Sequence, residues 1–193
     1  MDATYVEGKT FERTDFRKNP PVKADYEDCT FIGCELSEVN LSGINFISCR
    51  FEECNLSLAK LGHTGFRDTE FIGCKLLGLR FADCNENGLS VNFKRCNLRN
   101  ASFYRTKLKK TLFSACDLQE TDFGECDAGG SVFENCDLRL AIFDNSKLEK
   151  ADFRGSVNYS IDPARNKLKK ARFSLTGLPG LLEKYELDID PSS

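Results

Sequence analysis

The chain has 193 residues, a formal net charge of −3, ten cysteines, one methionine and no tryptophan. This length corresponds to a single domain. The first residues contain no apolar run of seven or more, and no stretch approaches the length of a membrane span. We therefore expect neither a signal peptide nor a membrane anchor, and we predict a cytoplasmic protein.

The first regular segment begins near Val6, and its large apolar residues return at every fifth position. A period of five matches neither the 3.6-residue repeat of a helix nor the two-residue repeat of an ordinary strand. Pro20 and Pro21 interrupt the series, and because proline lacks an amide donor, we expect the first coil to be irregular. The apolar series consists of Val6, Phe11, Phe16, Tyr26, Phe31, Leu36, Leu41, Phe46, Phe51, Leu56, Leu61, Phe66, Phe71, Leu76 and Phe81.

A short insertion follows this segment. The spacing from Phe81 to Phe93 is twelve residues instead of ten, and the Asn- and Gly-containing stretch 85–90 has the composition of a turn. We expect a small loop there that divides a repeat domain of residues 1–155 into two stacks, residues 4–84 and 91–155. A tolerated surface insertion and a binding loop both remain possible interpretations.

The second segment carries the same period with greater regularity. Two residues of each five are apolar or small, so we expect both to face a shared core, while the other three carry the charge and form a turn. The large core residues are Phe93, Leu98, Phe103, Leu108, Phe113, Leu118, Phe123, Phe133, Leu138, Phe143, Leu148 and Phe153, with Ala128 as the one small exception. Like residues recur at intervals of twenty, as in Cys96, Cys116 and Cys136. Four sides of five residues per coil, a square parallel β-solenoid, is the simplest interpretation.

All ten cysteines occupy the small inward position of this five-residue frame. Cysteine behaves there as a small hydrophobic residue, like Ala, Thr and Ser. Metal binding would need CxxC pairs or nearby histidines, which are absent. Cysteines on neighbouring coils would lie ~4.8 Å apart, within reach of a disulfide. We nevertheless predict ten free thiols.

The C-terminal region, residues 156–193, departs from the regular repeat. Leu168 and Phe173 stay in phase, which predicts a last, partial coil. Leu178, Leu181, Leu182 and Tyr185 then follow helical spacing with Pro179 in the first turn, so we expect a short amphipathic α-helix. Leu187 and Ile189 alternate like a strand. This segment could cap the open end of the solenoid or also form a homodimer.

No motif for nucleotide binding, nucleophilic catalysis or a zinc protease occurs in the chain. The one histidine, His63, lies at an outward position without a partner for acid–base chemistry. We therefore expect no catalytic residue, no metal site, no cofactor and no enzymatic activity.

Charge is unevenly distributed along the second segment. Between Lys94 and Lys110 the chain has seven bases and no acid. The following stretch is net −7 and contains Asp117, Glu120, Asp122, Glu125, Asp127, Glu134, Asp137, Asp144, Glu149 and Asp152. A solvated outer surface explains such charge in any solenoid. Direct binding of nucleic acid through the basic stretch is not expected at a net charge of −3.

Several five-residue units resemble those of the pentapeptide-repeat proteins. CDLQE at 116–120, CDLRL at 136–140 and ADFRG at 151–155 show the sequence small, Asp, Leu or Phe, variable, variable. The resemblance extends over about residues 4–155 and implies a right-handed quadrilateral β-helix. VNYSID at 157–162, KKARFSL at 169–175 and LLEKYELDID at 181–190 further resemble AlbG-type members of the Qnr, McbG, AlbG and MfpA group.

Proteins of that group bind DNA gyrase or topoisomerase IV and protect it from quinolones or peptide toxins. The resemblance therefore implies a homodimer that mimics duplex DNA and binds a type II topoisomerase. A coil rise of ~4.8 Å gives a rod of ~40 Å, along which B-DNA would carry ~24 charges, so a net charge of −3 permits only local mimicry. We expect the acidic residues of 117–152 to form that surface. A scaffold for another protein partner is the alternative, and a patchwork of charge instead of a continuous acidic stripe would favour it.

Overall fold

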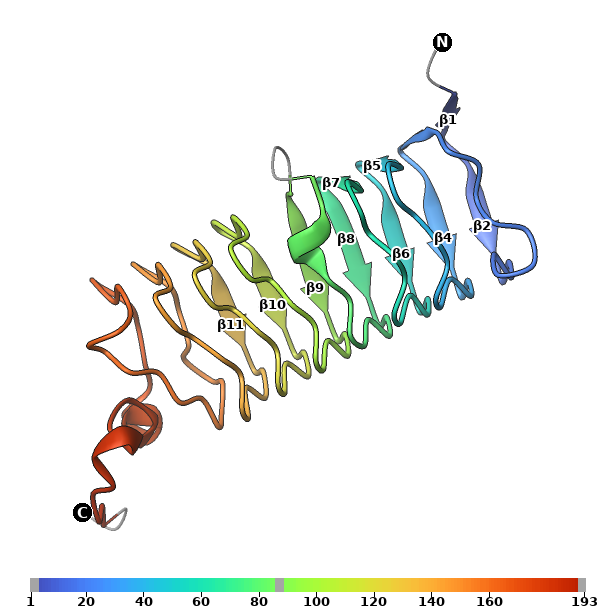
Figure 1. The fold of residues 1–193 in the computed structure, drawn as a ribbon. Coiled ribbons are helices and arrows are strands. Elements are labelled where there is room, and N and C mark those ends of the chain that lie inside the picture. The colour runs from blue at the N-terminus through green and yellow to red at the C-terminus, as the bar shows by residue number, and fades with distance from the viewer. Residues whose placement is uncertain (1–3, 86–88, 191–193) are drawn as a thin grey trace.

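The structure is a computed structural model that describes residues 4–85 and 89–190. The chain winds into a rod of stacked four-sided coils, with the N-terminus at one end and a short helical segment at the other (Figure 1). This arrangement confirms the predicted parallel β-solenoid. One parallel sheet contains β1 (Tyr5–Glu7), β3 (Asp25–Glu27), β5 (Asn45–Ile47) and β7 (Gly65–Arg67). The other contains β2 (Thr10–Glu12), β4 (Thr30–Ile32), β6 (Arg50–Glu52), β8 (Thr69–Ile72), β9 (Val91–Lys94), β10 (Leu112–Ser114) and β11 (Val132–Glu134).

The coils are in register at intervals of twenty residues, as the sequence predicts. Phe31 lies opposite Phe51, and isolated parallel bridges such as Glu35 to Asn55 continue the pattern outside the strands. We name the four sides by the outward residues at the second position of each unit. These are 5, 25, 45, 65, 107, 127, 147 and 167 on side A; 10, 30, 50, 70, 92, 112, 132, 152 and 172 on side B; 15, 35, 55, 75, 97, 117, 137 and 157 on side C; and 40, 60, 80, 102, 122 and 142 on side D.

The predicted insertion is visible as a change of register. Glu70 pairs with Asn92 and Lys75 bridges to Asn97, so the interval rises from twenty to twenty-two. Strand β8 pairs directly with β9, and the sheet of side B therefore continues past the insertion. The other sheet ends at β7. The extra residues follow a short 3-10 turn, η1 (Phe81–Asp83), and residues 86–88 lie outside the described part of the chain.

The core is built from stacked aromatic rings, and every predicted core residue of the second segment is buried. Phenylalanines of side B form one column from Phe11 to Phe173, in which successive ring centroids lie 4.5–5.4 Å apart. A second column changes sides at the insertion. It follows side A up to Phe66 and then side D from Phe81 to Phe143. The insertion therefore separates two differently packed stacks that share one continuous sheet.

The ten cysteines are buried and free, as predicted. Seven of the thiols donate hydrogen bonds to backbone carbonyls of the preceding coil; Cys54 Sγ, for example, lies 3.3 Å from Phe31 O. Thr64 and Ser156 donate the same bond from the equivalent position, to Leu41 O and Phe133 O. Cysteine therefore fits the inward position both as a small apolar side chain, like Ala101 and Ala151, and as a donor, like Thr64 and Ser156.

Burial shields all ten thiols from solvent in the folded protein. Burial raises the pKa of the thiols of Cys49, Cys84 and Cys126 to about 12, so these groups stay protonated at pH 8. We expect Ellman titration of the unreduced protein to detect almost no thiol under native conditions and ten per chain in denaturant. A value clearly below ten in denaturant would mean that disulfides form and would contradict the packing role.

The C-terminal helical segment is present but is of 3-10 type, where the sequence predicts an α-helix. It comprises η2 (Leu175–Leu181) and η3 (Glu183–Tyr185), and its hydrogen bonds run from residue i to i−3, as from Leu182 N–H to Pro179 O. Gly177 and Gly180 both press against Tyr159, where a Cβ atom would clash. Side chains three residues apart eclipse each other in a 3-10 helix, so this winding places both glycines against the same residue.

The remainder of the C-terminal region only partly follows its prediction. Leu181 packs against the core, so the segment contributes to the cap. Residues 186–190, which alternate like a strand, form no strand with any residue that the structure describes. Leu187 and Ile189 instead line an open cleft beside the last coils. Across residues 4–85 and 89–190, no helix has the length and apolar character needed to cross a membrane.

Candidate protein-binding surfaces

The predicted acidic residues do not lie together on one side of the rod. Consecutive five-residue units lie on successive sides of a coil. The acidic residues of 117–152 are therefore distributed over all four sides. Asp117 and Asp137 are on side C with Glu120 at its corner; Asp122, Glu125 and Asp144 are on side D; Asp127 and Glu149 are on side A; and Glu134 and Asp152 are on side B. The structure thus brings together only small groups of them, chiefly Asp117, Glu120, Asp122 and Asp137.

Seven of these ten acidic residues form ion pairs. The pairs are Arg99 with Asp117 and Glu120, Arg105 with Glu125, Lys109 with Asp127, Arg139 with Asp137, Arg165 with Asp144, and Arg154 and Arg172 with Asp152. Asp122, Glu134 and Glu149 form none with residues of the described ranges. The preceding basic stretch supplies Arg99, Arg105 and Lys109, because it lies one coil away.

Ion pairing lowers the pKa of two of these carboxyl groups. The Arg105 guanidinium, which binds Glu125 at 2.8 Å, holds the pKa of that carboxyl below its usual value. Arg154 does the same for the pKa of Asp152 through a 2.7 Å contact. These carboxylates therefore stay ionised at any pH near neutral. Their charge is largely offset by the adjacent bases, which makes the surface a patchwork.

Aspartates at the second position of each unit also have a local structural role. Oδ1 of Asp117, Asp122 and Asp137 accepts a hydrogen bond of 2.8–3.1 Å from the N–H two residues ahead, which stabilises the turn. Asn55 and Asn97 make the same bond with their amide oxygens on other coils. An Asp-to-Asn change at these positions therefore removes charge and keeps the turn.

An apolar surface lies at the C-terminal end. Of the six predicted cap or dimer residues, only Leu181 packs against the core. Leu178, Leu182, Tyr185, Leu187 and Ile189 are 37–58% exposed. An open cleft of about 870 Å³ lies between this segment and side C, and its lining includes Leu140, Leu182, Leu187 and Ile189. We call these residues, with Tyr185, the C-terminal apolar surface.

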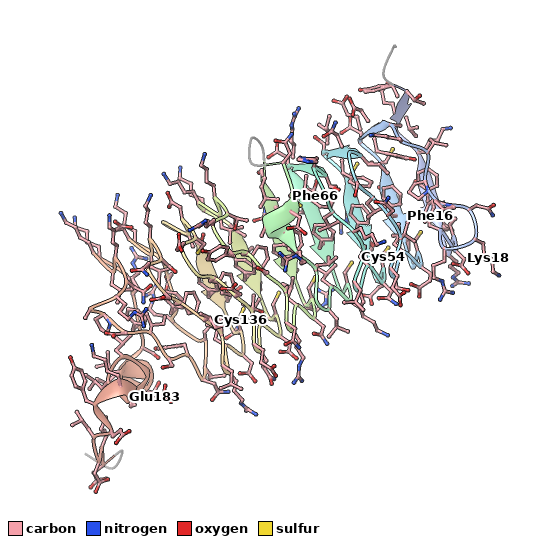
Figure 2. All side chains as sticks on the ribbon, viewed as in Figure 1. Phe16, Lys18, Cys54, Phe66, Cys136 and Glu183 are labelled. Atoms are coloured by element: carbon pink, nitrogen blue, oxygen red, sulfur yellow. The ribbon has the colours of Figure 1, made fainter. Side chains whose placement is uncertain are left out.

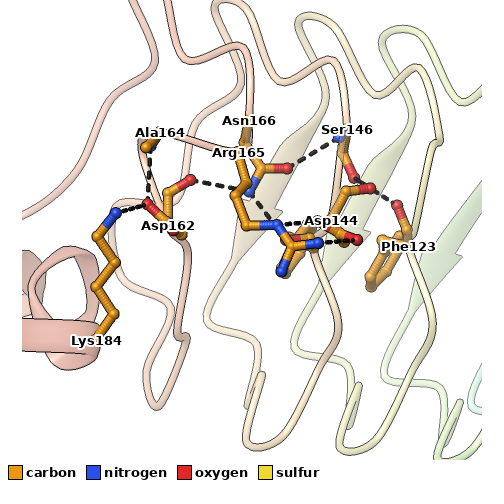
Figure 3. A network of polar contacts seen from close by, with 9 residues as sticks. Phe123, Asp144, Ser146, Asp162, Ala164, Arg165, Asn166 and Lys184 are labelled. Atoms are coloured by element: carbon orange, nitrogen blue, oxygen red, sulfur yellow. Dashed lines mark hydrogen bonds and ion pairs between the residues drawn. The ribbon is translucent and has the colours of Figure 1, made fainter.

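A polar network fixes this segment to the last coil (Figure 3). Lys184 Nζ donates to Asp162 Oδ1 at 2.6 Å and lowers the pKa of that carboxyl. Asn166, which takes the place of a small inward residue, donates to Asp162 O at 3.1 Å and to Phe143 O at 2.9 Å, and it accepts from Ser146 N–H. The C-terminal apolar surface is therefore held in a defined position relative to the rod.

Within the described ranges, no three His, Cys, Asp or Glu side chains are grouped so that they could hold a metal ion. His63 is exposed, at a corner of the solenoid. The geometry defines a four-sided solenoid of five-residue units with charged sides and an exposed apolar surface at its C-terminal end.

Comparison with known proteins agrees with this class. The family model for the pentapeptide repeat region matches residues 24–88, 44–113 and 88–173, and the chain therefore belongs to the pentapeptide-repeat family. A solved structure of trypsin-treated QnrB1, a plasmid-mediated fluoroquinolone resistance protein, is similar over 98% of this chain and 95% of its own, with 21% identity and a TM-score of 0.55.

HetL, a pentapeptide-repeat protein involved in heterocyst differentiation regulation in the cyanobacterium Nostoc sp. strain PCC 7120, is similar over 91% of this chain and 88% of its own, with 18% identity and a TM-score of 0.49. A search of curated protein sequences finds no match. The likeness to QnrB1 agrees with the solenoid fold described above.

Proposed function

We propose that the protein is a non-enzymatic binding protein that attaches to DNA gyrase or topoisomerase IV and protects it from quinolone or peptide-toxin inhibitors. The observation that carries this proposal is the likeness to QnrB1, a fluoroquinolone resistance protein, which extends over 98% of this chain and 95% of that one. The likeness covers the C-terminal region as well as the repeats. The exposed C-terminal apolar surface suits a homodimer, which would double the length of the rod.

The proposed contact with the topoisomerase lies on sides C and D, around Asp117, Glu120, Asp122 and Asp137. These carboxylates lie on two neighbouring coils, where they offer a local imitation of duplex charge. The Arg99 and Arg139 contacts with them are long, 3.9–4.0 Å, and partly exposed. Because exposed ion pairs are worth only about 0–1 kcal/mol, basic groups of a partner can replace them.

A scaffold for a different protein partner is the second candidate. The specific observation in its favour is the charge pattern, since seven of the ten acidic residues are already paired with bases of this chain. A duplex, in contrast, presents unpaired phosphates on both strands. The two candidates differ in whether a type II topoisomerase responds to the protein.

A supercoiling assay with ciprofloxacin tests the proposal. We expect the wild-type protein to restore gyrase activity in the presence of the drug. The variant Asp117→Asn, Asp122→Asn, Asp137→Asn keeps the turn hydrogen bonds and should need about tenfold more protein for the same effect. Tenfold corresponds to ~1.4 kcal/mol, which lies within the range expected for three exposed charges.

The matched control is Asp15→Asn, Asp28→Asn, Asp68→Asn, which changes net charge equally in the coils before the insertion and should protect like the wild type. Equal loss in both variants would show that the acidic group on sides C and D is not the contact. If the wild-type protein leaves supercoiling, drug inhibition and enzyme binding unchanged with gyrase and topoisomerase IV from several bacteria, the scaffold function replaces the proposal.

A further inference from the structure

Side A reverses its charge along the rod. In the N-terminal half its outward residues include Glu7, Asp25, Glu27, Asp28 and Asp68, with Arg67 as the one base in those units. Beyond the insertion, side A becomes a lysine surface, visible as a row of nitrogen-tipped side chains along the upper edge of the yellow-to-orange coils (Figure 2). This lysine side consists of the outward residues Lys107, Lys109, Lys110, Asp127, Gly129, Gly130, Lys147, Glu149, Lys150, Lys167, Lys169 and Lys170.

The lysine side holds eight lysines and two carboxylates, a net charge of +6. All eight lysines are exposed. Only Lys109 forms an ion pair within the part of the chain that the structure describes, with Asp127 at 3.2 Å. Because the whole chain is net −3, everything outside the lysine side is net −9. The net charge of the whole chain therefore gives no indication of this strongly basic surface.

The solenoid fixes the spacing of these lysines. Parallel bridges connect Lys107 to Asp127, Asp127 to Lys147 and Lys147 to Lys167. Successive coils are ~4.8 Å apart, so this column extends ~14 Å along the rod. Lys110, Lys150 and Lys170 form a second column at the corner, where all three have φ of 60–62° and the same backbone geometry. These two columns hold six of the eight lysines, and Lys109 and Lys169 belong to the same units.

The chemistry of the array identifies its partner. A small anion would need preorganised donors, whereas these ammonium groups are separate and mobile. A protein interface would need an apolar centre and is usually poor in lysine. None of the exposed large apolar residues lies on the lysine side, so it also lacks an anchor for a membrane. It has no aromatic residue on which unpaired bases could stack. Phosphates of a nucleic-acid duplex need only such cations.

We propose that the lysine side binds the sugar-phosphate backbone of double-stranded nucleic acid without regard to sequence. One strand of B-DNA has a phosphate every ~3.4 Å along its axis, so a ~14 Å column spans about four phosphates. At the ~8 Å Debye length of physiological salt, the acidic groups on the opposite sides of the rod are largely screened. The site is distinct from the topoisomerase contact on sides C and D and from the C-terminal apolar surface.

Fluorescence anisotropy with a labelled 25-base-pair DNA of arbitrary sequence tests the proposal without any topoisomerase. Four phosphate contacts predict a log–log salt slope of about −3.6, which lowers the affinity about a hundredfold between 50 and 200 mM salt. The variant Lys107→Gln, Lys147→Gln, Lys150→Gln, Lys167→Gln should bind at least about tenfold more weakly at 50 mM salt and show a shallower slope.

The matched control, Lys18→Gln, Lys23→Gln, Lys60→Gln, Lys75→Gln, makes the same change in net charge from exposed lysines outside the lysine side and should bind within about threefold of the wild type. Circular dichroism melts verify that each variant folds. Absence of wild-type binding at 50 mM salt, or equal loss in both variants, would overturn the proposal. So would capture of the wild type by vesicles of anionic phospholipid without binding to the duplex, since the lysine side would then be a membrane surface.

Discussion

Replacing Phe123 by Ala is expected to lower the free energy of unfolding by about 3–5 kcal/mol, because it empties a fully enclosed site between two coils. The Phe123 ring has no exposed surface. It stacks on Phe103 at 5.3 Å and on Phe143 at 4.9 Å, and it meets Phe113 and Phe133 edge to face at 5.7–5.8 Å. For a chain of this size, 1 kcal/mol shifts the melting temperature by ~2–4 °C, so the expected decrease is about 10 °C.

Phe123→Leu is the matched control. Leu41 and Leu61 occupy the same position of side D in earlier coils and are fully or almost fully buried there. Leucine therefore fits this position of the frame and should cost about 1–2 kcal/mol, through lost ring contacts and a smaller volume. Thermal melts followed by circular dichroism measure both variants. A melting temperature that the Ala substitution leaves unchanged would contradict the packing of the second stack.

The five-residue frame is the part of the fold that the sequence predicts well. Each coil has nearly the same packing, so Phe93, Phe113 and Phe133 occupy the same environment at intervals of twenty residues. The insertion is equally visible, because any added residue shifts the phase of everything after it. Even the free cysteines follow from the frame, since most side chains at their inward position are small.

The grouping of charged side chains on the surface is predicted poorly by their proximity in the sequence. A run of consecutive residues wraps around all four sides, so the acidic residues of 117–152 separate in space. Residues twenty or forty apart meet instead, as Lys107, Lys147 and Lys167 do on side A. Sorting the charges by side, once the frame is known, would have revealed the lysine side and the pairing of Arg99, Arg105 and Lys109 with acids of the next coil.

Backbone conformation at the corners has no clear signal in the sequence. The fifth residue of most units has a left-handed backbone, including Leu140 at φ 59° and Lys150 at φ 61°. This conformation costs an L-residue roughly 1–2 kcal/mol. Backbone hydrogen bonds between coils, such as Lys150 N–H to Lys169 O at 3.0 Å, offset the cost. Because the backbone and not the side chain stabilises the corner, many residue types occur there.

The C-terminal segment is the element whose local pattern misled most. The leucine spacing of this segment predicts an α-helix. It contains no information about Tyr159, which precedes the segment in the sequence but contacts it in the folded protein. The close approach of Gly177 and Gly180 to that ring favours a 3-10 helix. A helix this short depends on tertiary packing for its stability, and leucine spacing alone does not report such packing.

We expect the wild-type protein to be a homodimer at micromolar concentration, with a mass by light scattering of twice the 21.7 kDa chain. The physical reason is the C-terminal apolar surface, where Leu182, Tyr185, Leu187 and Ile189 remain 37–58% exposed around an open cleft. Apolar groups gathered in this way are usually buried by a partner. A second copy presents the same surface, and a twofold axis can bring the two together.

The variant Leu182→Glu, Leu187→Glu should be a monomer of 21.7 kDa under the same conditions. Burying each leucine contributes roughly 1.5–3 kcal/mol, and an unpaired carboxylate in its place adds a desolvation cost. Together these raise the dissociation constant at least about a hundredfold. The control Val22→Glu, Leu58→Glu alters two exposed apolar residues far from this end, each 59% exposed, and should stay dimeric. A monomeric wild type would contradict the proposed homodimer. A double variant that remains dimeric would place the interface on another surface of the solenoid.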